Sequence, residues 1–351
     1  MTDATEARGR ARRATLRDVA ALARVDASLV SRIINDDPKA SAAPQTRQRI
    51  IDAVRELDYR PNVAARGLRM ARTWTMGVLV PSVTNPMYAD VIAGAEARAQ
   101  ELGYGIVFRT HVEGAREEHF TRLLQQGRVD GLLIASGLLR DAFMRRIASG
   151  EDGPVVLVNR RINGLKASVV VDDEAGAALA TQHLIDNGHE HLVGLFGPPA
   201  IDTSRRRRKG YSKALRAASL DLVAVDMPGW DFRNGYEGTH QIFDAHPQTT
   251  AVFVSTMVMA VGAIRALAER GLSVPDDVSL VALHDSDLAN FLNPPLTTVS
   301  LPVLQMGAVA VDLLASLIDG GPSRSVVVDG EPVLIERRSV SKRRGRRESN
   351  V

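Results

Sequence analysis

The stretch TLRDVAALARVDASLVSRIIN, residues 15–35, has the pattern of two short helices separated by a tight turn. Thr15 is a suitable cap for the first helix, and Asp18 completes a capping-box-like pair three residues later. Apolar residues recur at helical spacing until Arg24, and Asp26 is a good cap for the second helix. We therefore predict a helix-turn-helix, although an ordinary helical hairpin has the same bare pattern.

The outer face of the second predicted helix carries small and polar side chains: Ala27, Ser28, Ser31, Arg32 and Asn35. Small residues allow a helix to enter the major groove of DNA closely. Ser and Arg side chains then reach base edges or phosphates. We expect this face to bind DNA, with Thr15 at the start of the preceding helix.

Basic residues are concentrated at the two ends of the chain. Residues 1–72 contain 15 Lys+Arg and 9 Asp+Glu, residues 73–336 contain 22 and 31, and residues 337–351 contain 7 and 1. A basic head on an acidic body indicates a polyanion partner for the head, with plain solvated charge as the alternative. The last residues, 338–351, are expected to form a basic disordered tail.

Length and composition exclude several classes of protein. With 351 residues and 45% hydrophobic content, the chain can form two or three folded domains. The absence of cysteine excludes disulfides and thiolate metal sites and favours a reducing compartment. Because we find neither a signal peptide nor an apolar run of membrane-spanning length, we expect a cytoplasmic protein with no membrane partner.

From Thr75 onward, apolar runs of strand length alternate with helical stretches. The runs TMGVLVP, GIVFRT, VDGLLIAS and PVVLVN are separated by predicted helices near 87–102, 114–126 and 138–148. The cycle repeats with HLVGLFG, TTAVFVST and VSLVALHD. Continuous apolar strands with intervening helices are typical of parallel sheets covered on both faces. The fold class is therefore α/β, with two doubly wound parallel-sheet subdomains behind the helical head.

Taken together, these motifs resemble the LacI/GalR (lactose repressor) family. The resemblance rests on TLRDVAALARVDASLVSRIIN and TRQRIIDAVRELDYRPNVAARGLR in the head, and on GVLVPSVTNPMY, HLVGLFGPP, GLSVPDDVSLVALHD and PPLTTV in the body. They occur in family order over nearly the whole chain. The resemblance implies a periplasmic-binding-protein-like body and a ligand-controlled repressor that binds operator DNA as a dimer.

The resemblance also implies the domain organisation. A disordered basic arm (1–14) precedes the helix-turn-helix domain (15–61), a hinge helix or linker (62–74), the effector-binding and dimerisation body (75–337) and the tail (338–351). Within the body, subdomain 1 covers about 75–174 and 303–333, and subdomain 2 covers about 175–300. The chain is expected to cross between them near 172–176, 299–303 and 332–336.

The hinge follows Pro61, which ends the third helix of the head. Asn62 can cap a following helix, but a helix this short is mostly unfolded in water. In the family this segment becomes helical on the operator and inserts a leucine into the minor groove, the position that Leu68 occupies here, with Ala65 one turn earlier. Such wedges bend DNA. A plain linker is the alternative.

Three residues of the head depart from the family pattern. Arg24 stands where glycine is usual, and a left-handed backbone there would cost arginine roughly 1 kcal/mol. Leu29 replaces a common threonine, and Ala43 precedes Pro44 where a capping serine is usual. The operator sequence therefore cannot be copied from a relative.

Ligands of open α/β sheets bind beyond the carboxyl ends of the strands. By resemblance, the effector-binding residues at these positions are Asn85, Met87, Tyr88, Thr203, Arg207 and Trp230. Sugars suit this set, because their CH faces stack on aromatic rings and arginine donates paired hydrogen bonds to hydroxyls. Tyr88 and Trp230 could also be plain core residues.

The predicted cleft departs from the family at two positions. Thr256 and Met257 stand where Asn-Asp is usual, and His284 and Asp285 stand where two aspartates are usual. We keep Thr256, His284 and Asp285 as effector-binding candidates. An imidazole near its ordinary pKa would make effector affinity change between about pH 5.5 and 7.5.

The sequence has features of three possible functions. The first is a dimeric, effector-controlled repressor of a carbohydrate-utilisation operon, bound to a pseudo-palindromic operator. The second is a solute-binding receptor without a DNA role, which the head, the hinge and the missing signal peptide oppose. An enzyme is the third, but P-loop and dinucleotide motifs are missing, and the histidines 183, 189 and 191 fit a surface or cap position. We expect no catalytic residue, no cofactor and no metal, and a dimer because the tail lacks a leucine heptad.

Overall fold

The computed structural model describes residues 14–34, 40–59, 72–110, 118–135, 139–148 and 153–343, with the backbone alone at 118–121. The chain divides into two compact units, Met1–Thr73 and Trp74–Val351. The first is the helical head and the second is the α/β body. Asn35, Asn62, Ala65 and Leu68 lie outside the described residues.

The described part of the head contains three helices: α1 (Leu16–Ala23), α2 (Ala27–Ile34) and α3 (Pro44–Glu56). Their apolar faces form a small core that includes Val19, Val30 and Ile50. The capping box is confirmed, since the Thr15 side chain accepts from the backbone N–H of Asp18 and the Asp18 carboxylate accepts from that of Thr15. The predicted helix-turn-helix is therefore present.

Two of the three residues of the head that depart from the family pattern, Arg24 and Ala43, lie at helix ends. Arg24 closes α1 at φ 53° and ψ 52°, in the left-handed region that favours glycine. Its backbone N–H is directed to the carbonyls of Ala20 and Ala21, so the turn keeps its hydrogen bonds. Ala43 precedes α3 without a side-chain cap.

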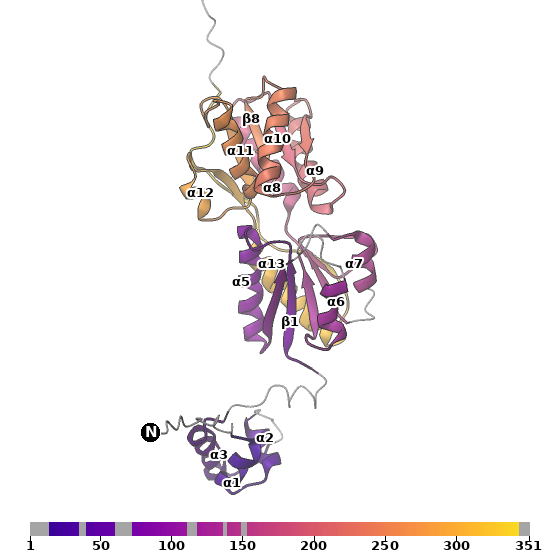
Figure 1. Ribbon diagram of the computed structural model, residues 1–351, viewed down its shortest axis with the longest axis vertical. Helices are drawn as coiled ribbons and strands as arrows, with labels where there is room; N and C mark the ends of the chain where they lie inside the picture. Colours follow the sequence, from indigo (N-terminus) through magenta and orange to yellow (C-terminus); the bar gives the residue numbers. More distant parts are fainter. Residues whose placement is uncertain are drawn as a thin grey trace, which may run out of the picture. The chain divides into compact units, whose positions relative to one another are not determined.

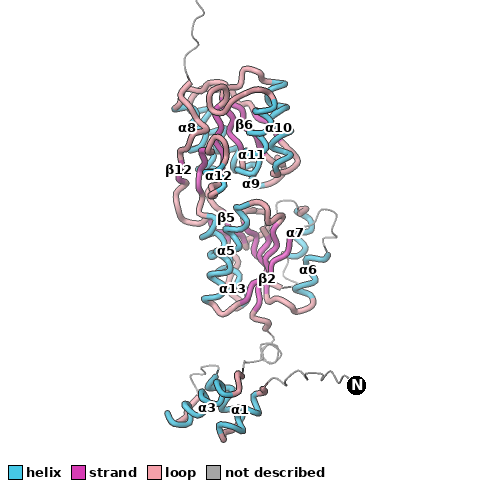
Figure 2. The backbone as a smooth tube through the Cα atoms, turned by 60° about the vertical axis from the view of Figure 1, so that its left-hand side comes forward, coloured by secondary structure: helices cyan, strands magenta, loops and turns pink. Residues whose placement is uncertain are grey.

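The body contains two six-stranded sheets (Figures 1 and 2). The first has the order β11-β5-β4-β3-β1-β2 and the second the order β12-β10-β9-β8-β6-β7. The first sheet contains β1 (Thr75–Val80), β2 (Gly105–Thr110), β3 (Gly131–Ile134), β4 (Val155–Val158), β5 (Ser168–Val170) and β11 (Ser325–Val327). The second contains β6 (Leu192–Phe196), β7 (Ala224–Asp226), β8 (Ala251–Val254), β9 (Ser279–Leu283), β10 (Thr297–Ser300) and β12 (Val333–Ile335). All neighbouring strands pair in parallel except β10 and β12.

Helices cover both faces of each sheet. The first lobe contains α5 (Pro86–Glu101), α6 (Glu118–Gln125), α7 (Asp141–Ile147) and α13 (Val303–Ile318). The second contains α8 (Asp173–Asp186), α9 (Asp202–Ala217), α10 (Phe232–Ala245), α11 (Met257–Glu269) and α12 (Leu288–Phe291). In Figure 1, α5 and α13 lie on the opposite side of the first sheet from α6 and α7. Separate buried clusters on the two faces of each sheet explain the continuous apolar strands.

The chain passes between the lobes three times, after β5, after β10 and after β11. Each lobe is therefore built from segments that lie far apart in sequence: β11 joins the sheet of β1–β5, and β12 joins the sheet of β6–β10. The α13 helix returns to pack beside α5, where Gly94 is essential: a Cβ there would lie 1.9 Å from the Leu304 carbonyl oxygen. The predicted fold class is confirmed.

Residues 338–343 differ from the expected disordered tail, because they are packed on the second lobe. The buried Ser339 hydroxyl donates to the Leu280 carbonyl (2.6 Å) and accepts from the Thr297 backbone N–H (2.8 Å). His189 is buried rather than at the surface, with its ring nitrogens beside the Thr250 hydroxyl (3.0 Å) and the Ser341 carbonyl (3.1 Å). Because this anchoring depends on polar groups that lie far apart in the chain, hydrophobic periodicity does not predict it.

Candidate functional site

The outer face of α2 exposes Ser28 and Arg32 one turn apart, with Arg32 Nη2 3.5 Å from the Ser28 hydroxyl. Ala27 and Ser31 on the same face are partly exposed, while Val30 and Ile33 are buried in the core of the head. Thr15 is exposed at the start of α1. The helix therefore separates a core face from a polar face, as a recognition helix requires.

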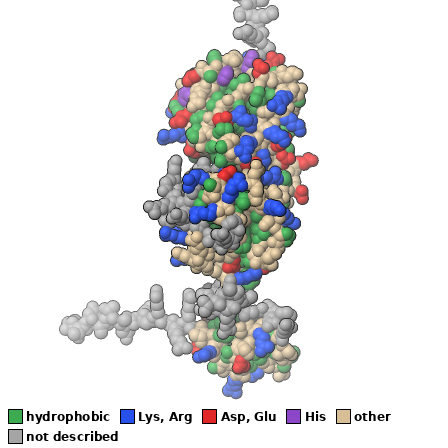
Figure 3. Space-filling model, turned by 90° about the vertical axis from the view of Figure 1, so that its right-hand side faces the viewer, with side chains coloured by type: hydrophobic (Ala, Val, Ile, Leu, Met, Phe, Trp, Pro, Cys, Tyr) green, Lys and Arg blue, Asp and Glu red, His purple; other side chains and the backbone are tan. Residues whose placement is uncertain are grey.

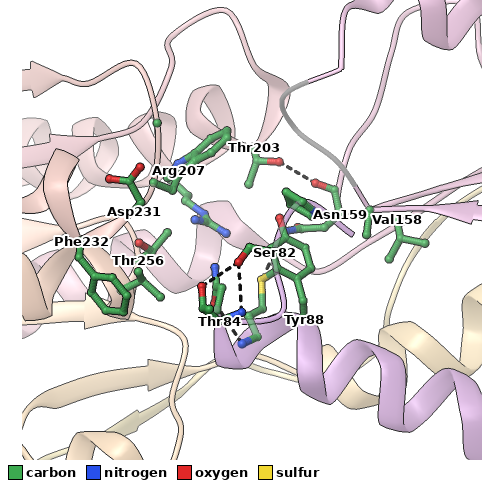
Figure 4. Close-up of a pocket in the computed structure, with 17 residues that line it drawn as sticks. Ser82, Thr84, Tyr88, Val158, Asn159, Thr203, Arg207, Asp231, Phe232 and Thr256 are labelled. Atoms are coloured by element: carbon green, nitrogen blue, oxygen red, sulfur yellow. Dashed lines mark hydrogen bonds between the residues drawn. The ribbon is translucent and has the colours of Figure 1, made fainter. Parts of the chain in front are cut away.

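A cavity of about 300 Å³ lies between the two lobes of the body. Seven predicted effector-binding residues line it: Asn85, Met87, Tyr88, Thr203, Arg207, Trp230 and Thr256. These residues lie in the loops after β1, β6, β7 and β8 or at the start of the helix that follows. They are close together because they all follow the carboxyl ends of strands, where ligands of open α/β sheets bind. Figure 4 shows the Arg207 guanidinium between Asp231 and Thr256 on one side and Thr203 and Asn159 on the other.

Arg207 is buried and held from three directions. Its Nε donates to Asp173 (2.6 Å), its Nη1 to the Ser255 carbonyl (2.8 Å), and its Nη2 lies 2.7 Å from His284 Nε2. Asp173 is fully buried, and it also pairs with Arg206. Burial alone would raise the pKa of Asp173, but the two guanidinium groups outweigh burial and the net shift is downward. The carboxylate is therefore ionised, and the arginine is fixed before any ligand arrives.

His284 does not line the cavity, which corrects the expectation of direct effector contact. It is buried behind Arg207, with a left-handed backbone at φ 67°. Burial, aided by the positive charge of Arg207, lowers the pKa of His284 to about 3. The expected titration between pH 5.5 and 7.5 is therefore wrong. The neutral ring instead accepts a hydrogen bond from Arg207 through Nε2, with its proton on Nδ1.

Asp285 is also absent from the cavity lining. Its carboxylate accepts from Arg337 Nη1 (2.7 Å) and from the Thr298 hydroxyl. Arg337 in turn donates to the Leu296 carbonyl (2.9 Å). Asp285 thus ties the turn after β9 to the segment after β12, a role that depends on a residue 52 positions away.

The cavity also includes residues that sequence reasoning missed. Asn159 follows β4, in a left-handed conformation at φ 58°, and its carbonyl accepts from the Thr203 hydroxyl (2.6 Å) across the two lobes. Asp231 caps α10 by accepting from the backbone N–H of Asn234 (2.8 Å). Asn159 directly follows the run PVVLV, so the strand-end rule could have found it.

The aromatic side chains in the cavity keep polar atoms available. Burial raises the pKa of Tyr88 to about 12, so its hydroxyl stays protonated. Trp230 packs over Gly197, where a Cβ would lie 2.1 Å from the indole Nε1. That Nε1 is buried and has no hydrogen-bond partner within the described part of the chain.

Comparison with known proteins assigns both units. The model "Bacterial regulatory proteins, lacI family" matches residues 15–62, and "Periplasmic binding protein-like domain" matches residues 181–340. The HTH-type transcriptional repressor PurR of Aliivibrio fischeri is 31% identical over 341 residues, which cover 94% of this chain and 99% of that protein. The chain belongs to the LacI family.

Two further LacI-family members support the assignment. The ribose operon repressor of Escherichia coli is 32% identical over 330 residues, covering 93% of this chain and 99% of that protein. The solved structure of the lac repressor dimer bound to operator and the anti-inducer ONPF has a TM-score of 0.80 and 28% identity, covering 94% of this chain and 100% of that one. These proteins match the head and the body together.

This LacI-family chain is therefore an effector-controlled, DNA-binding transcriptional regulator and not an enzyme. The family explains why a helical head precedes a cleft of two lobes.

Figure 3 shows one face of the body, on which Lys and Arg side chains are mixed with Asp and Glu. Across the described ranges, none of the helices has the length and apolar character needed to span a membrane.

Proposed function

We propose that the protein is a homodimeric repressor of carbohydrate-utilisation genes. It binds a pseudo-palindromic operator in the cytoplasm, and a sugar or sugar derivative in the cavity controls this binding. The main support is that seven effector candidates line one cavity in a chain whose head exposes Ser28 and Arg32 on one helix face. No chemistry beyond binding is needed.

In this proposal the head reads the operator through α2. Ser28 and Arg32 contact base edges in the major groove, Ala27 and Ser31 allow close approach, and Asn35 continues the face. Thr15 contacts the phosphate backbone at the start of α1. Asn62, Ala65 and Leu68 form the hinge, with Leu68 as a minor-groove wedge.

The effector is held between the lobes. Arg207 donates hydrogen bonds to it, and Trp230 provides a stacking surface, while Asn85, Tyr88, Thr203 and Thr256 supply polar groups around it and Met87 an apolar contact. The name of the ribose operon repressor, at 32% identity, supports a sugar-related ligand. A cavity of about 300 Å³ suits a ligand of one ring.

Exposed apolar side chains support the homodimer. On α12 of the second lobe, Phe291 is 84% exposed and Leu288 is 42% exposed. Large apolar side chains exposed together are typical of protein interfaces. We expect Phe291→Asp to shift the protein towards monomer in sedimentation velocity, with exposed Leu222→Asp as the control that does not.

Electrophoretic mobility shift tests the whole proposal. The full-length protein should retard duplex DNA from the region upstream of its own gene, and a ligand that raises its melting temperature should change this retardation. Binding should weaken steeply with salt, because phosphates are neutralised in both half-sites. A protein that binds ligand in the cavity and ignores DNA would instead be a solute-binding receptor.

A further inference from the structure

Of the described residues that line the cavity, Arg207 and Asp231 carry charged side chains. They differ in their surroundings: the Arg207 side chain is 2% exposed, whereas Asp231 lies at the exposed start of α10. The Asp231 carboxylate is already engaged as a helix cap, with Oδ1 accepting from the backbone and side-chain nitrogens of Asn234 (2.8 and 2.7 Å). The buried charge that a ligand meets is therefore positive.

Arg207 retains hydrogen-bonding capacity. A guanidinium has five N–H donors, and three are used by Asp173, the Ser255 carbonyl and His284. Among the described residues this leaves one N–H on each Nη nitrogen. Two donors on one planar group match the two oxygens of a carboxylate.

Arg207 belongs to a largely buried cluster of two arginines and two aspartates, because Arg206 also pairs with Asp202. Asp173 is the carboxylate partner of Arg207, and Asp173 shares its two oxygens between Arg207 and Arg206. On the opposite side of the guanidinium, His284 is a neutral acceptor, because a protonated ring could not accept the Arg207 hydrogen bond. Arg207 is the member of this cluster that lines the cavity, so the cluster presents a positively charged group to a ligand there.

Other groups in the cavity suit hydroxyls. Asn159 is 8% exposed, and its Oδ1 is buried with no hydrogen-bond partner among the described residues. Asn159 Oδ1 can therefore accept from a ligand hydroxyl, and the buried Trp230 Nε1 can donate to a ligand oxygen. A buried polar atom without a hydrogen-bond partner costs free energy, so a ligand that forms hydrogen bonds with both of these atoms is favoured.

We propose that the effector is a small hydroxylated carboxylic acid, such as a sugar acid, whose carboxylate binds Arg207 and whose hydroxyls bind Asn159 and Trp230. This rests on the proposed function of the cavity and specifies its ligand. A carboxylate fits better than a phosphate ester, since one guanidinium with two free donors matches a single negative charge. His284 determines this specificity without touching the ligand.

The test is a thermal-shift and calorimetry comparison of the full-length protein with matched ligands. Each hexuronate or aldonate is paired with the neutral sugar or polyol of the same configuration, and sugar phosphates form a third arm. The acid of at least one pair should raise the melting temperature and bind about tenfold to a hundredfold more tightly than its neutral partner. Equal or tighter binding of the neutral partner or of a phosphate, or no shift with any acid, would overturn the proposal.

His284→Asp and His284→Asn are the matched variants. Aspartate and asparagine both tolerate the left-handed backbone, so the variants differ mainly in charge. His284→Asp places a second carboxylate against Arg207 and should remove the preference for the acid, whereas His284→Asn should retain it. The same preference in both variants would overturn the role of His284. The proposed function and the ligand proposal fail in different ways. If the proposed function is wrong, the full-length protein binds no DNA, whichever ligand it prefers.

Discussion

Nη2 of Arg207 lies 2.7 Å from Nε2 of His284, and the same guanidinium binds Asp173 through Nε. This relationship makes His284 a positioning residue for Arg207. It also fixes the protonation state of the imidazole, because the ring must accept the hydrogen bond. The arginine is thereby oriented before the effector binds, which reduces the entropic cost of binding.

Breaking the buried ion pair should destabilise the body. In Asp173→Asn two guanidinium groups lose their shared carboxylate, and we expect a loss of about 3 kcal/mol in the free energy of unfolding. Urea denaturation measures it. The control is the adjacent Asp172→Asn, since Asp172 is an exposed cap of α8 and asparagine caps equally well. Equal losses in both variants would contradict the ion-pair account.

The stability of the body should fall at acid pH because of His284. Its pKa is about 3 in the folded protein against an ordinary value of 6.5. Between these values the unfolded chain binds a proton that the folded protein excludes, so stability decreases as the pH falls from about 6.5 towards 3. Melting temperatures across this range should fall less in His284→Asn than in the wild type. Parallel curves would show that His284 is not buried in its neutral form.

The packed segment 338–343 should contribute to stability through Ser339. Ser339→Ala leaves the Leu280 carbonyl and the Thr297 N–H without their buried partner, at a cost of about 2 kcal/mol. Chemical denaturation of this variant is compared with Ser323→Ala, in which the serine is exposed. If Ser339→Ala proved as stable as Ser323→Ala, residues 338–343 would not be held as described.

Arg32 should provide sequence discrimination. If it makes a bidentate contact to guanine, Arg32→Ala should lose about 1–3 kcal/mol of affinity for operator DNA and much less for scrambled DNA. Fluorescence anisotropy titrations at fixed salt give both values. Equal losses on the two DNAs would place Arg32 on a phosphate instead.

Periodicity predicts the fold, and the family resemblance predicts seven of the residues that line the cavity, but neither predicts Asn159 and Asp231 there. The helix-turn-helix and the two sheets follow from local patterns, whereas the assignment of Arg207 to the cavity follows from the family resemblance. The roles of His284 and Asp285 did not follow, because they depend on partners 77 and 52 residues away. Burial decides whether an imidazole titrates near neutral pH, and a sequence does not state burial. The anchoring of Ser339 was missed for the same reason.

Selection of DNA from a random-sequence pool by the full-length protein tests the central claim most directly. A LacI-type regulator with two symmetry-related heads should enrich an inverted repeat with half-sites at one fixed spacing. Arg32→Ala should lose this enrichment while keeping the melting temperature of its body. Recovery of an unenriched pool by the wild-type protein, under low-salt conditions in which it is folded, would contradict the account.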